Sequence, residues 1–220
     1  MTDKPTTGTK QRRKREKERR RRDILEAARE VFFAHGFKHS SMDMIAERSQ
    51  LAKGTLYLYF RNKEDLYVSL IEDGFNILAG MIATSVAEES DVESKIVAIA
   101  RSFNRFAKEH NDFFTIFSTL SAGDMRDIHE RVDADNLNRL YDQEKAEFSK
   151  SVALIEKGKS IGLFRADIDA QYSMRMIWSA IHGATLHCNK NKHRHFDQID
   201  SEQMASDIVR GLLQSFKPAS

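Results

Sequence analysis

The sequence MDMIAERSQLAKGTLYLYFRNK, residues 42–63, decides how the rest of the chain is interpreted. It holds two short segments with the apolar spacing of helices, and a tight connection separates them. The small residue Ala46 in the first segment lets two helices cross closely, while Leu56 and Phe60 in the second lie on one helix face. The pattern predicts a helix-turn-helix over about residues 41–60, whose second helix is free to enter a DNA groove.

The outward side chains of the second segment suit DNA. Lysine pairs with a phosphate, threonine offers a hydroxyl and a methyl group, tyrosine offers a flat ring with a hydroxyl tip, and glycine lets the backbone approach the duplex. The residues are Lys53, Gly54, Thr55, Tyr57 and Tyr59. Tyrosines near a helix end are also often half-buried packing residues, so both interpretations stay open for the two tyrosines.

Residues on either side of the motif are candidates for phosphate contacts. Ser40 or Ser41 should cap the first helix of the motif, where a hydroxyl is well placed to touch a phosphate. Asn62 should cap the next helix, and Lys63 follows on its first turn beside free backbone amides. That helix should continue to the mid-80s and so link the DNA-binding part to the rest of the chain.

Residues 22–66 resemble the DNA-binding domain of tetracycline-repressor-type (TetR family) transcription regulators. The matching segments are ILEAAREVFFAHGF at 24–37, SSMDMIA at 40–46 and KGTLYLYFRNKEDL at 53–66, in the family's order and spacing. The resemblance implies a three-helix DNA-binding domain, followed by a helical domain that binds a small effector and forms a homodimer.

The chain departs from the family pattern at two positions. Gln50 stands where the family usually has glycine, and adopting the left-handed turn conformation should cost it roughly 1 kcal/mol. Ala52 stands where a serine is usual, and it can neither cap the recognition helix nor donate to a phosphate. The resemblance therefore assigns no role to Ala52.

Composition predicts an all-α fold of about nine helices. The chain has 220 residues and two prolines, Pro5 and Pro218, so none interrupts the helical apolar spacing between them. The expected organisation is a basic disordered arm at 1–19, the DNA-binding domain at 20–80, and an effector-binding and dimerisation domain at 81–220.

Charge is distributed unevenly along the chain. Residues 1–22 hold eleven Lys/Arg against three Asp/Glu, while the whole chain has a net charge of only +2. A basic arm on a mildly acidic body favours a polyanion partner, and its place before a DNA-binding domain favours DNA over a merely solvated tail. The single cysteine, Cys188, excludes an internal disulfide, and no apolar run reaches the ~18 residues of a membrane span, so we expect a cytoplasmic protein.

Two helices near the C-terminus carry apolar stripes that a monomer would cover poorly. They are expected from just after Asp167 or Asp169 to about Cys188, and from Ser201 to Phe216. The resemblance implies that they pair with their copies as a four-helix dimer interface, and the alternative is ordinary internal core. The candidate interface residues are Tyr172, Met176, Ser179, Gly183, Met204, Ile208 and Leu212.

The middle of the second domain is rich in aromatic residues, where the resemblance implies an effector cavity. Plain core is the alternative, since aromatic residues at helical spacing usually pack internally. Glu144 falls on the apolar stripe of a helix expected over about residues 133–158, so it needs either a partner such as Arg175, a place at the stripe's edge, or a ligand. The candidate pocket residues are Phe103, Phe106, Phe117, Tyr141, Glu144, Phe148 and Trp178.

Metal and catalytic sites find little support. The spacing of His182, His187, Cys188, His193 and His195 does not place two ligands on one helix face, which favours solvated histidines, and the chain holds no recognised catalytic motif. We therefore expect no metal and no cofactor. The predicted function is a homodimeric repressor that binds a palindromic DNA operator and is released by a small-molecule effector. A constitutive DNA-binding protein and a helical enzyme with an appended DNA-binding unit are the alternatives.

Overall fold

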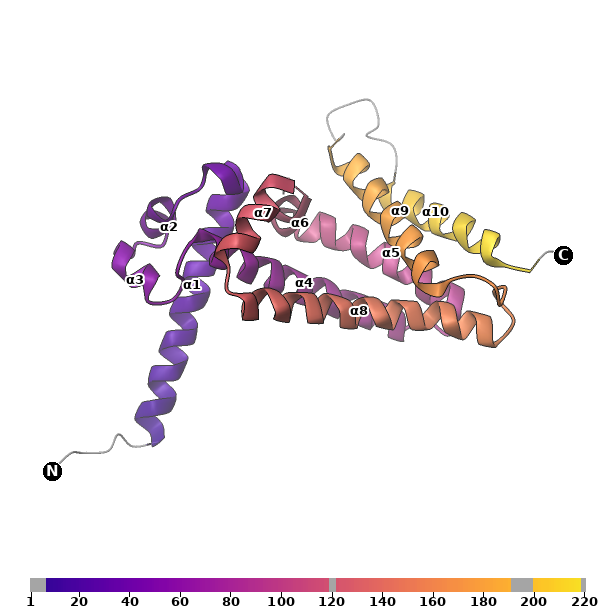
Figure 1. Cartoon of the computed structure of the whole chain (residues 1–220), viewed down its shortest axis with the longest axis horizontal. Coiled ribbons are helices and arrows are strands. Elements are labelled where there is room, and N and C mark those ends of the chain that lie inside the picture. The colour runs from indigo at the N-terminus through magenta and orange to yellow at the C-terminus, as the bar shows by residue number, and fades with distance from the viewer. Residues whose placement is uncertain (1–6, 119–121, 191–199, 219–220) are drawn as a thin grey trace. The chain divides into compact units, whose positions relative to one another are not determined.

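The computed structural model describes residues 7–118, 122–190 and 200–218, and its secondary structure there is entirely α-helical (Figure 1). This confirms the predicted fold class. Ten helices stand where about nine were expected: α1 Thr7–His39, α2 Met42–Arg48, α3 Lys53–Tyr57, α4 Lys63–Ala87, α5 Val92–Glu109, α6 Asn111–Ser118, α7 Ala122–Arg131, α8 Ala134–Ser160, α9 Ala170–Lys190 and α10 Ser201–Phe216.

The helices form two compact units that are not consecutive in the sequence. The first unit combines the chain up to Glu72 with Thr115–Leu137, and the second combines Asp73–Phe114 with the chain from Asn138 onward. Helices α4, α6 and α8 each contribute residues to both units. This grouping differs from the linear division near residue 80 that the sequence suggested, because uninterrupted helices, and no polar linker, cross between the units.

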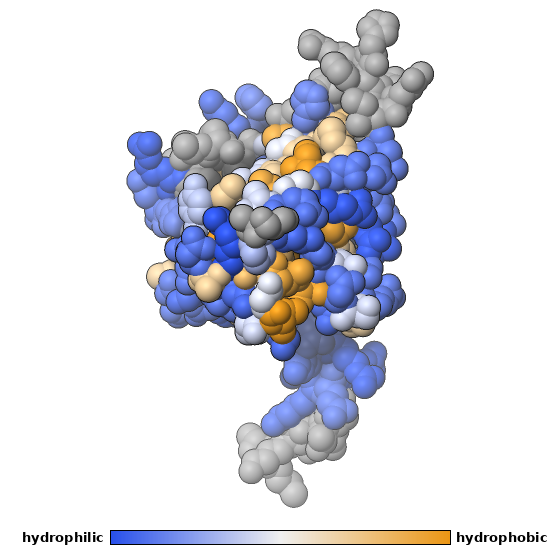
Figure 2. Space-filling view, turned by 90° about the vertical axis from the view of Figure 1, so that its right-hand side faces the viewer, coloured by the Kyte–Doolittle hydropathy of each residue, from blue (hydrophilic) through white to orange (hydrophobic). Residues whose placement is uncertain are grey.

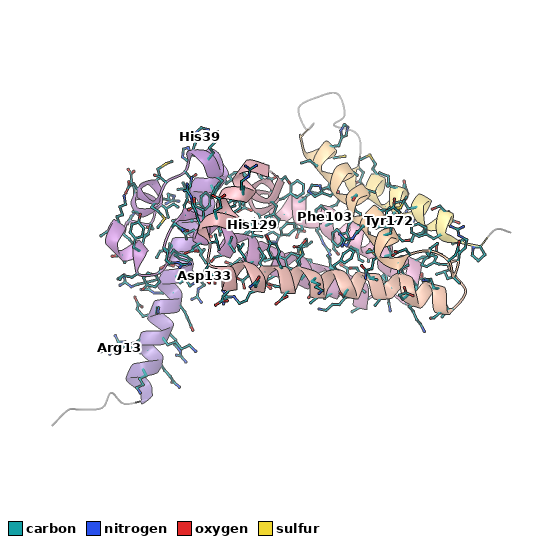
Figure 3. The ribbon with its side chains drawn as sticks, in the orientation of Figure 1. Arg13, His39, Phe103, His129, Asp133 and Tyr172 are labelled. Atoms are coloured by element: carbon teal, nitrogen blue, oxygen red, sulfur yellow. The ribbon has the colours of Figure 1, made fainter. Side chains whose placement is uncertain are left out.

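Helix α1 begins much earlier than predicted. Residues 7–19, expected to be disordered, are helical, because Lys, Arg, Gln and Glu are good helix formers. Glu16 also accepts charged hydrogen bonds from Arg19 at 3.0 Å and from Arg20 at 3.1 Å, one turn further along. Figure 3 shows the side chains around Arg13 radiating from this part of α1, with no other element of the first unit beside them.

An aromatic cluster forms the core of the first unit. Gly36 adopts φ 73° and kinks the end of α1 where the sequence predicted a stop, which brings Phe37 into the core. The ring of Tyr67 on α4 packs edge-on against Phe32 at 5.4 Å and Phe37 at 4.8 Å. Its hydroxyl donates to the carbonyl of Ile116, which ties α4 to the end of α6.

The helix-turn-helix has the predicted turn chemistry. Ser41 caps α2 by accepting a hydrogen bond from the Met44 amide at 3.3 Å, and Gln50 adopts the left-handed conformation with φ 54°. No side chain caps α3, as expected for Ala52. The recognition helix ends at Tyr57, earlier than the predicted end at Phe60, and residues 58–60 continue as hydrogen-bonded turns.

Helix α4 is apolar enough, by length and composition alone, to span a membrane, although the sequence reading found no such run. An 18-residue window has a mean hydropathy of 1.3. Core helices of soluble proteins pass the same test, and Leu66, Leu70 and Leu78 of α4 are buried. Only 33% of that window is buried, so packing within the units covers part of its apolar surface.

In the second unit, α5, α9 and α10 pack against one another. Asp91 caps α5 and Asp200 caps α10, and the bounds of α10 are those predicted from sequence. The chain after α8 turns back sharply, with Gly162 at φ 73°. This places the buried ring of Phe164 edge-on against Phe216 at 6.1 Å, which anchors the C-terminal end of α10.

The turn after α8 packs Phe164 against Gly158, and only a glycine at position 158 leaves room for this ring. A Cβ atom at this position would lie 2.2 Å from Cδ2 of Phe164, whose ring is 2% exposed and cannot swing into solvent. We predict that Gly158→Ala lowers the free energy of unfolding by about 1–3 kcal/mol, measured by urea denaturation. Gly80→Ala is the matched control, since a Cβ there meets nothing within 4 Å and should add about 0.5–1 kcal/mol. Equal effects of the two substitutions would contradict the packing argument.

Candidate nucleic-acid interface and ligand pocket

The outer face of α3 is accessible. Lys53, Gly54 and Tyr57 are exposed, Thr55 and Tyr59 are half-buried, and Leu56 faces inward. Leu58 is 78% exposed, the largest exposure among the large apolar side chains described, and the sequence reading did not single it out. A large apolar side chain beside Tyr57 can contact thymine methyl groups, so it extends the candidate surface.

Lys53 is held at the edge of this surface. Its ammonium group forms an ion pair with the Asp43 carboxylate at 2.6 Å, joining the start of α3 to α2. The hydrogen bond that Lys53 donates to Asp43 raises the pKa of Lys53, so the side chain stays charged. A DNA phosphate would have to compete with Asp43 for this ammonium group.

Two predicted phosphate ligands serve the fold. Ser40 is buried, and its hydroxyl donates to the carbonyl of Gly36 at 2.6 Å. The Lys63 ammonium donates to the carbonyls of Phe37 at 3.0 Å and Ser40 at 3.1 Å, and it lies 4.5 Å from the centre of the Phe37 ring. Both side chains donate hydrogen bonds to backbone carbonyls at the kinked end of α1. The Ser41 hydroxyl accepts the capping hydrogen bond of α2.

A polar network holds the start of α4 against α7 and α8 within the first unit. Asn62 caps α4 as predicted, accepting from the Asp65 amide at 2.7 Å, and its amide group donates to the Arg131 carbonyl at 3.0 Å. Arg131 also pairs with the buried Glu64 at 3.3 Å. Arg61 bridges the buried Asp65 at 3.3 Å and Asp133 at 3.1 Å. The sequence reading missed this network because it missed α7.

The different settings of the two lysines predict different effects. Lys63→Met keeps the apolar stem but leaves two carbonyls without a donor, so it should lower the free energy of unfolding by about 1–3 kcal/mol. Lys53→Met loses only an exposed ion pair, which solvent screens, and should change stability far less than Lys63→Met does. Urea denaturation of both variants measures the difference. If Lys63→Met is as stable as wild type, the Lys63 ammonium group is not needed by the fold and remains a candidate phosphate ligand.

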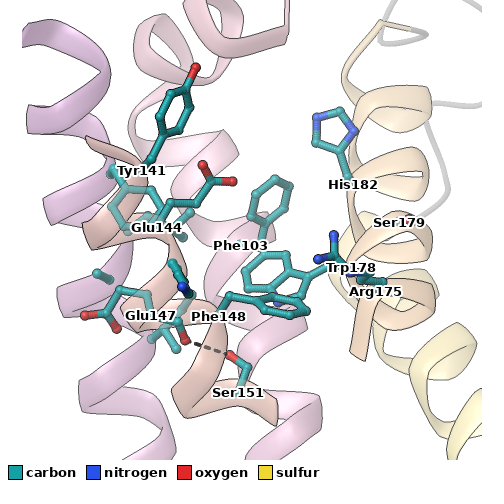
Figure 4. Close-up of a pocket in the computed structure, with 15 residues that line it drawn as sticks. Phe103, Tyr141, Glu144, Glu147, Phe148, Ser151, Arg175, Trp178, Ser179 and His182 are labelled. Atoms are coloured by element: carbon teal, nitrogen blue, oxygen red, sulfur yellow. Dashed lines mark hydrogen bonds between the residues drawn. The ribbon is translucent and has the colours of Figure 1, made fainter. Parts of the chain in front are cut away.

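The second unit contains a pocket of about 690 Å³ between α4, α5, α8 and α9 (Figure 4). Five of the seven predicted pocket residues line it: Phe103, Tyr141, Glu144, Phe148 and Trp178. The other two lie elsewhere. Phe106 is fully buried with its ring 5.5 Å from that of His110, and Phe117 belongs to the first unit.

The pocket wall is apolar on one side and mixed on the other. Helix α4 contributes Phe75, Leu78, Ala79 and Ile82, whereas α8 and α9 contribute aromatic and charged side chains. Figure 4 shows the Phe103, Phe148 and Trp178 rings gathered in the middle, with Glu144 on the α8 side and His182 on the α9 side. Sequence reasoning missed the α4 wall, Arg175 and His182, although Arg175 had been considered as a partner of Glu144.

Glu144 lies at the edge of the pocket. Its side chain is exposed, and it forms no ion pair with Arg175 among the described residues. Burial and the nearby Glu144 charge raise the pKa of Tyr141, one helical turn away. Of the sequence alternatives for Glu144, the edge position fits this geometry.

The predicted dimer residues all have accessible surface. Tyr172, at 65% exposure, together with Met176, Gly183 and Ile208, is exposed, and Met204 and Leu212 are half-buried. Ser179 is exposed too, but it also lines the pocket. Figure 2 looks at the side where α9 and α10 lie in Figure 1, and apolar side chains gather there inside a polar border. Large exposed apolar patches of this kind commonly mark interaction surfaces.

The described residues contain no cluster of three or more side chains able to hold a metal ion. His182 lies against the Phe103 ring at 5.9 Å, and burial raises the pKa of the half-buried Cys188. His193 and His195 lie outside the described residues.

Comparison with known proteins bears on the first unit most directly. Residues 24–70 match the family model described as bacterial regulatory proteins, tetR family. The fatty acid metabolism regulator protein of Bacillus subtilis is 33% identical over 89 residues, which cover 40% of this chain and 46% of that protein. The HTH-type transcriptional repressor NicS of Pseudomonas putida is 26% identical over 179 residues, covering 80% of this chain and 78% of the repressor.

The whole fold recurs in a solved structure. The transcriptional regulator FadR from Bacillus subtilis, in complex with stearoyl-CoA, superimposes with a TM-score of 0.69. The match covers 87% of this chain and 96% of that chain at 18% sequence identity, so the likeness is one of fold. The chain spans about half the length of the first curated relative and over three quarters of the second.

Proposed function

Because the chain is a tetR-family bacterial regulatory protein that carries the family's DNA-binding segment at residues 24–70, we propose how it regulates transcription. Its homodimer binds a palindromic operator and leaves it when a small molecule occupies the pocket. The observation that carries the DNA-binding part is the exposed face of α3, with Tyr57 and Leu58 turned outward on a short helix that Leu56 seats in the core. DNA as partner implies a cytoplasmic protein.

Helix α1 adds electrostatic attraction to the DNA-binding unit. Residues 10–22 hold ten Lys/Arg against two Glu, and nearly all of these side chains are exposed. Local ion pairs with Glu16 and Glu18 leave most of this charge uncompensated. The helical form supports contacts along the phosphate backbone next to the site that α3 reads.

A homodimer follows from the small size of the reading surface. Helix α3 spans only Lys53–Tyr57, too few residues for a long operator, whereas two copies read two half-sites. The exposed apolar residues of α9 and α10 support a symmetric interface there.

The pocket supports regulation by a ligand and disfavours a constitutive binder. Helices α4 and α8 line it, and the same two helices carry Lys63, Tyr67 and Asp135 in the first unit. A ligand that favours one position of α4 would change the spacing of the two recognition helices, so ligand and operator would weaken each other by the same factor. The stearoyl-CoA of the similar structure supports a ligand with an apolar part.

The DNA contact of α3 is tested with duplexes that the protein enriches from a randomised pool. Tyr57→Ala should lower affinity for the enriched sequence by about 1–3 kcal/mol and leave non-specific binding and thermal stability unchanged. Phe33→Ala, which removes another exposed aromatic side chain of the same unit, is the control and should bind normally. Mobility-shift titrations measure both. Unchanged affinity in Tyr57→Ala would remove α3 from the interface.

The dimer is tested by placing charge on the apolar face. Ile208→Lys should shift the protein from dimer to monomer in light scattering coupled to size exclusion, because a buried unpaired charge opposes association. Ile161→Lys is the control, since Ile161 is 55% exposed and lies between α8 and α9, outside the predicted interface. If Ile208→Lys remains dimeric at micromolar concentration, the interface lies elsewhere.

A further inference from the structure

We propose that the pocket selects apolar molecules that carry an anionic oxygen group, a carboxylate or a phosphate, and that Arg175 and Trp178 of α9 receive this group. The inference rests on the proposed function, because it assigns the chemical class of the effector. It depends on which polar groups of the pocket already have partners.

Trp178 supplies a hydrogen-bond donor without an acceptor. The half-buried indole packs edge-on against Phe103 at 5.8 Å, and its Nε1 is shielded from solvent with no hydrogen-bond acceptor among the described residues. Indole nitrogen donates and never accepts. A ligand oxygen that meets this N–H after a small movement of the ring would remove the cost of leaving it unpaired.

Arg175 lies one helical turn before Trp178, so the two side chains share a face of α9, and both line the pocket. The guanidinium carbon lies 5.1 Å from the centre of the Phe148 ring, and no described carboxylate forms an ion pair with it. This cation–π contact places the exposed guanidinium group beside the pocket, where its N–H groups remain available. A guanidinium group is suited to binding carboxylate and phosphate through two parallel hydrogen bonds.

The remaining charges favour the same sign of ligand. Four residues with full charges line the pocket, and Glu147 among them is paired with Lys150 at 2.6 Å. Lys145 and Arg175 then outnumber Glu144, and all three side chains are exposed. The unpaired lining residues therefore carry a net positive charge, with Arg175 on the same helix as the Trp178 donor and Lys145 on α8.

The apolar wall of α4 accounts for the rest of the ligand. Phe75, Leu78 and Ile82 of α4 present only hydrocarbon to the pocket, and α4 lies on the other side of the pocket from α9 (Figure 4). A volume of about 690 Å³ accommodates a chain or ring system of moderate size beside the charged group.

The chain offers a direct readout, because Trp178 is its single tryptophan. Its fluorescence can be titrated with dodecanoate, dodecyl phosphate, dodecanol and dodecyltrimethylammonium, which share one alkyl chain and differ in the head group. All are used below their micelle-forming concentrations. We expect at least one anion to bind about ten-fold more tightly than dodecanol, and the ammonium compound most weakly. The comparison of dodecanoate with dodecyl phosphate identifies which anion the site prefers.

Two variants assign the preference to residues. Arg175→Met keeps the apolar stem and should bring the anions to within about two-fold of dodecanol, while dodecanol binding is kept. Arg165→Met, outside the pocket, should behave as wild type. Trp178→Phe keeps a ring and removes the N–H. Calorimetry replaces fluorescence for this variant. It should bind the preferred anion several-fold more weakly than wild type and bind dodecanol with unchanged affinity.

Each outcome bears on the proposal. Tighter binding of the ammonium compound would overturn it in favour of Glu144 as the selecting residue. Equal binding of the anions and dodecanol, an anion preference that survives Arg175→Met, or no binding of any of the four compounds would also overturn it. The regulatory function is tested apart from this, by adding whichever compound binds to the protein–operator complex. Equal affinity for free and DNA-bound protein would end the induction mechanism even if the anion preference holds.

Discussion

Helix α4 packs into the cores of both units along one uninterrupted backbone, and the rest of the structure depends on this constraint. Its first turns bury Leu66, Tyr67 and Leu70 in the DNA-binding unit, while Phe75, Leu78 and Ile82 face the pocket of the second unit. A helix transmits displacement along its axis because each turn is hydrogen-bonded to the next. Any change that repositions α4 at one end must therefore be accommodated by packing at the other.

Around the start of α4, charged side chains brace the DNA-binding unit. Lys63 and Ser40 satisfy carbonyls near the kink at Gly36, and Arg61 and Arg131 bind the buried carboxylates of Asp65 and Glu64. This leaves α3, which has no side-chain cap and only five residues, to present its side chains from a support that is fixed on several sides. The reading surface is small, and most of the polar chemistry near it holds it in place.

Much of this organisation could be predicted from the sequence, because it depends on local patterns. The turn at Gln50, the Ser41 and Asn62 caps and the bounds of α10 follow from spacing and capping residues, whose effects act within a few positions. One local feature was nevertheless misjudged. Glu16 and its arginines stabilise a helix in a stretch whose composition resembles a disordered tail.

Long-range contacts were beyond the sequence patterns. Ser40 and Lys63 carry the residue types of phosphate ligands, and only the kinked end of α1 shows that their polar groups are used internally. Phe106 and Phe117 have the same aromatic character as Phe103, but tertiary packing decides which rings face the pocket. Helix α7 is short and polar, so periodicity did not reveal it or the ion pair between Arg131 and Glu64 of α4.

The solitary first turns of α1 have a consequence for how long the protein survives intact. From Lys14 to Arg20 the ion pairs join residues within the same stretch, so only local hydrogen bonds and local ion pairs oppose its unwinding. Amide protons there will exchange with solvent far faster than those of the buried core. Each Lys and Arg is also a cleavage site for trypsin-like proteases, which act on locally opened backbone. The free protein will therefore be trimmed first at its most basic segment, and a bound polyanion covering that segment will slow the loss.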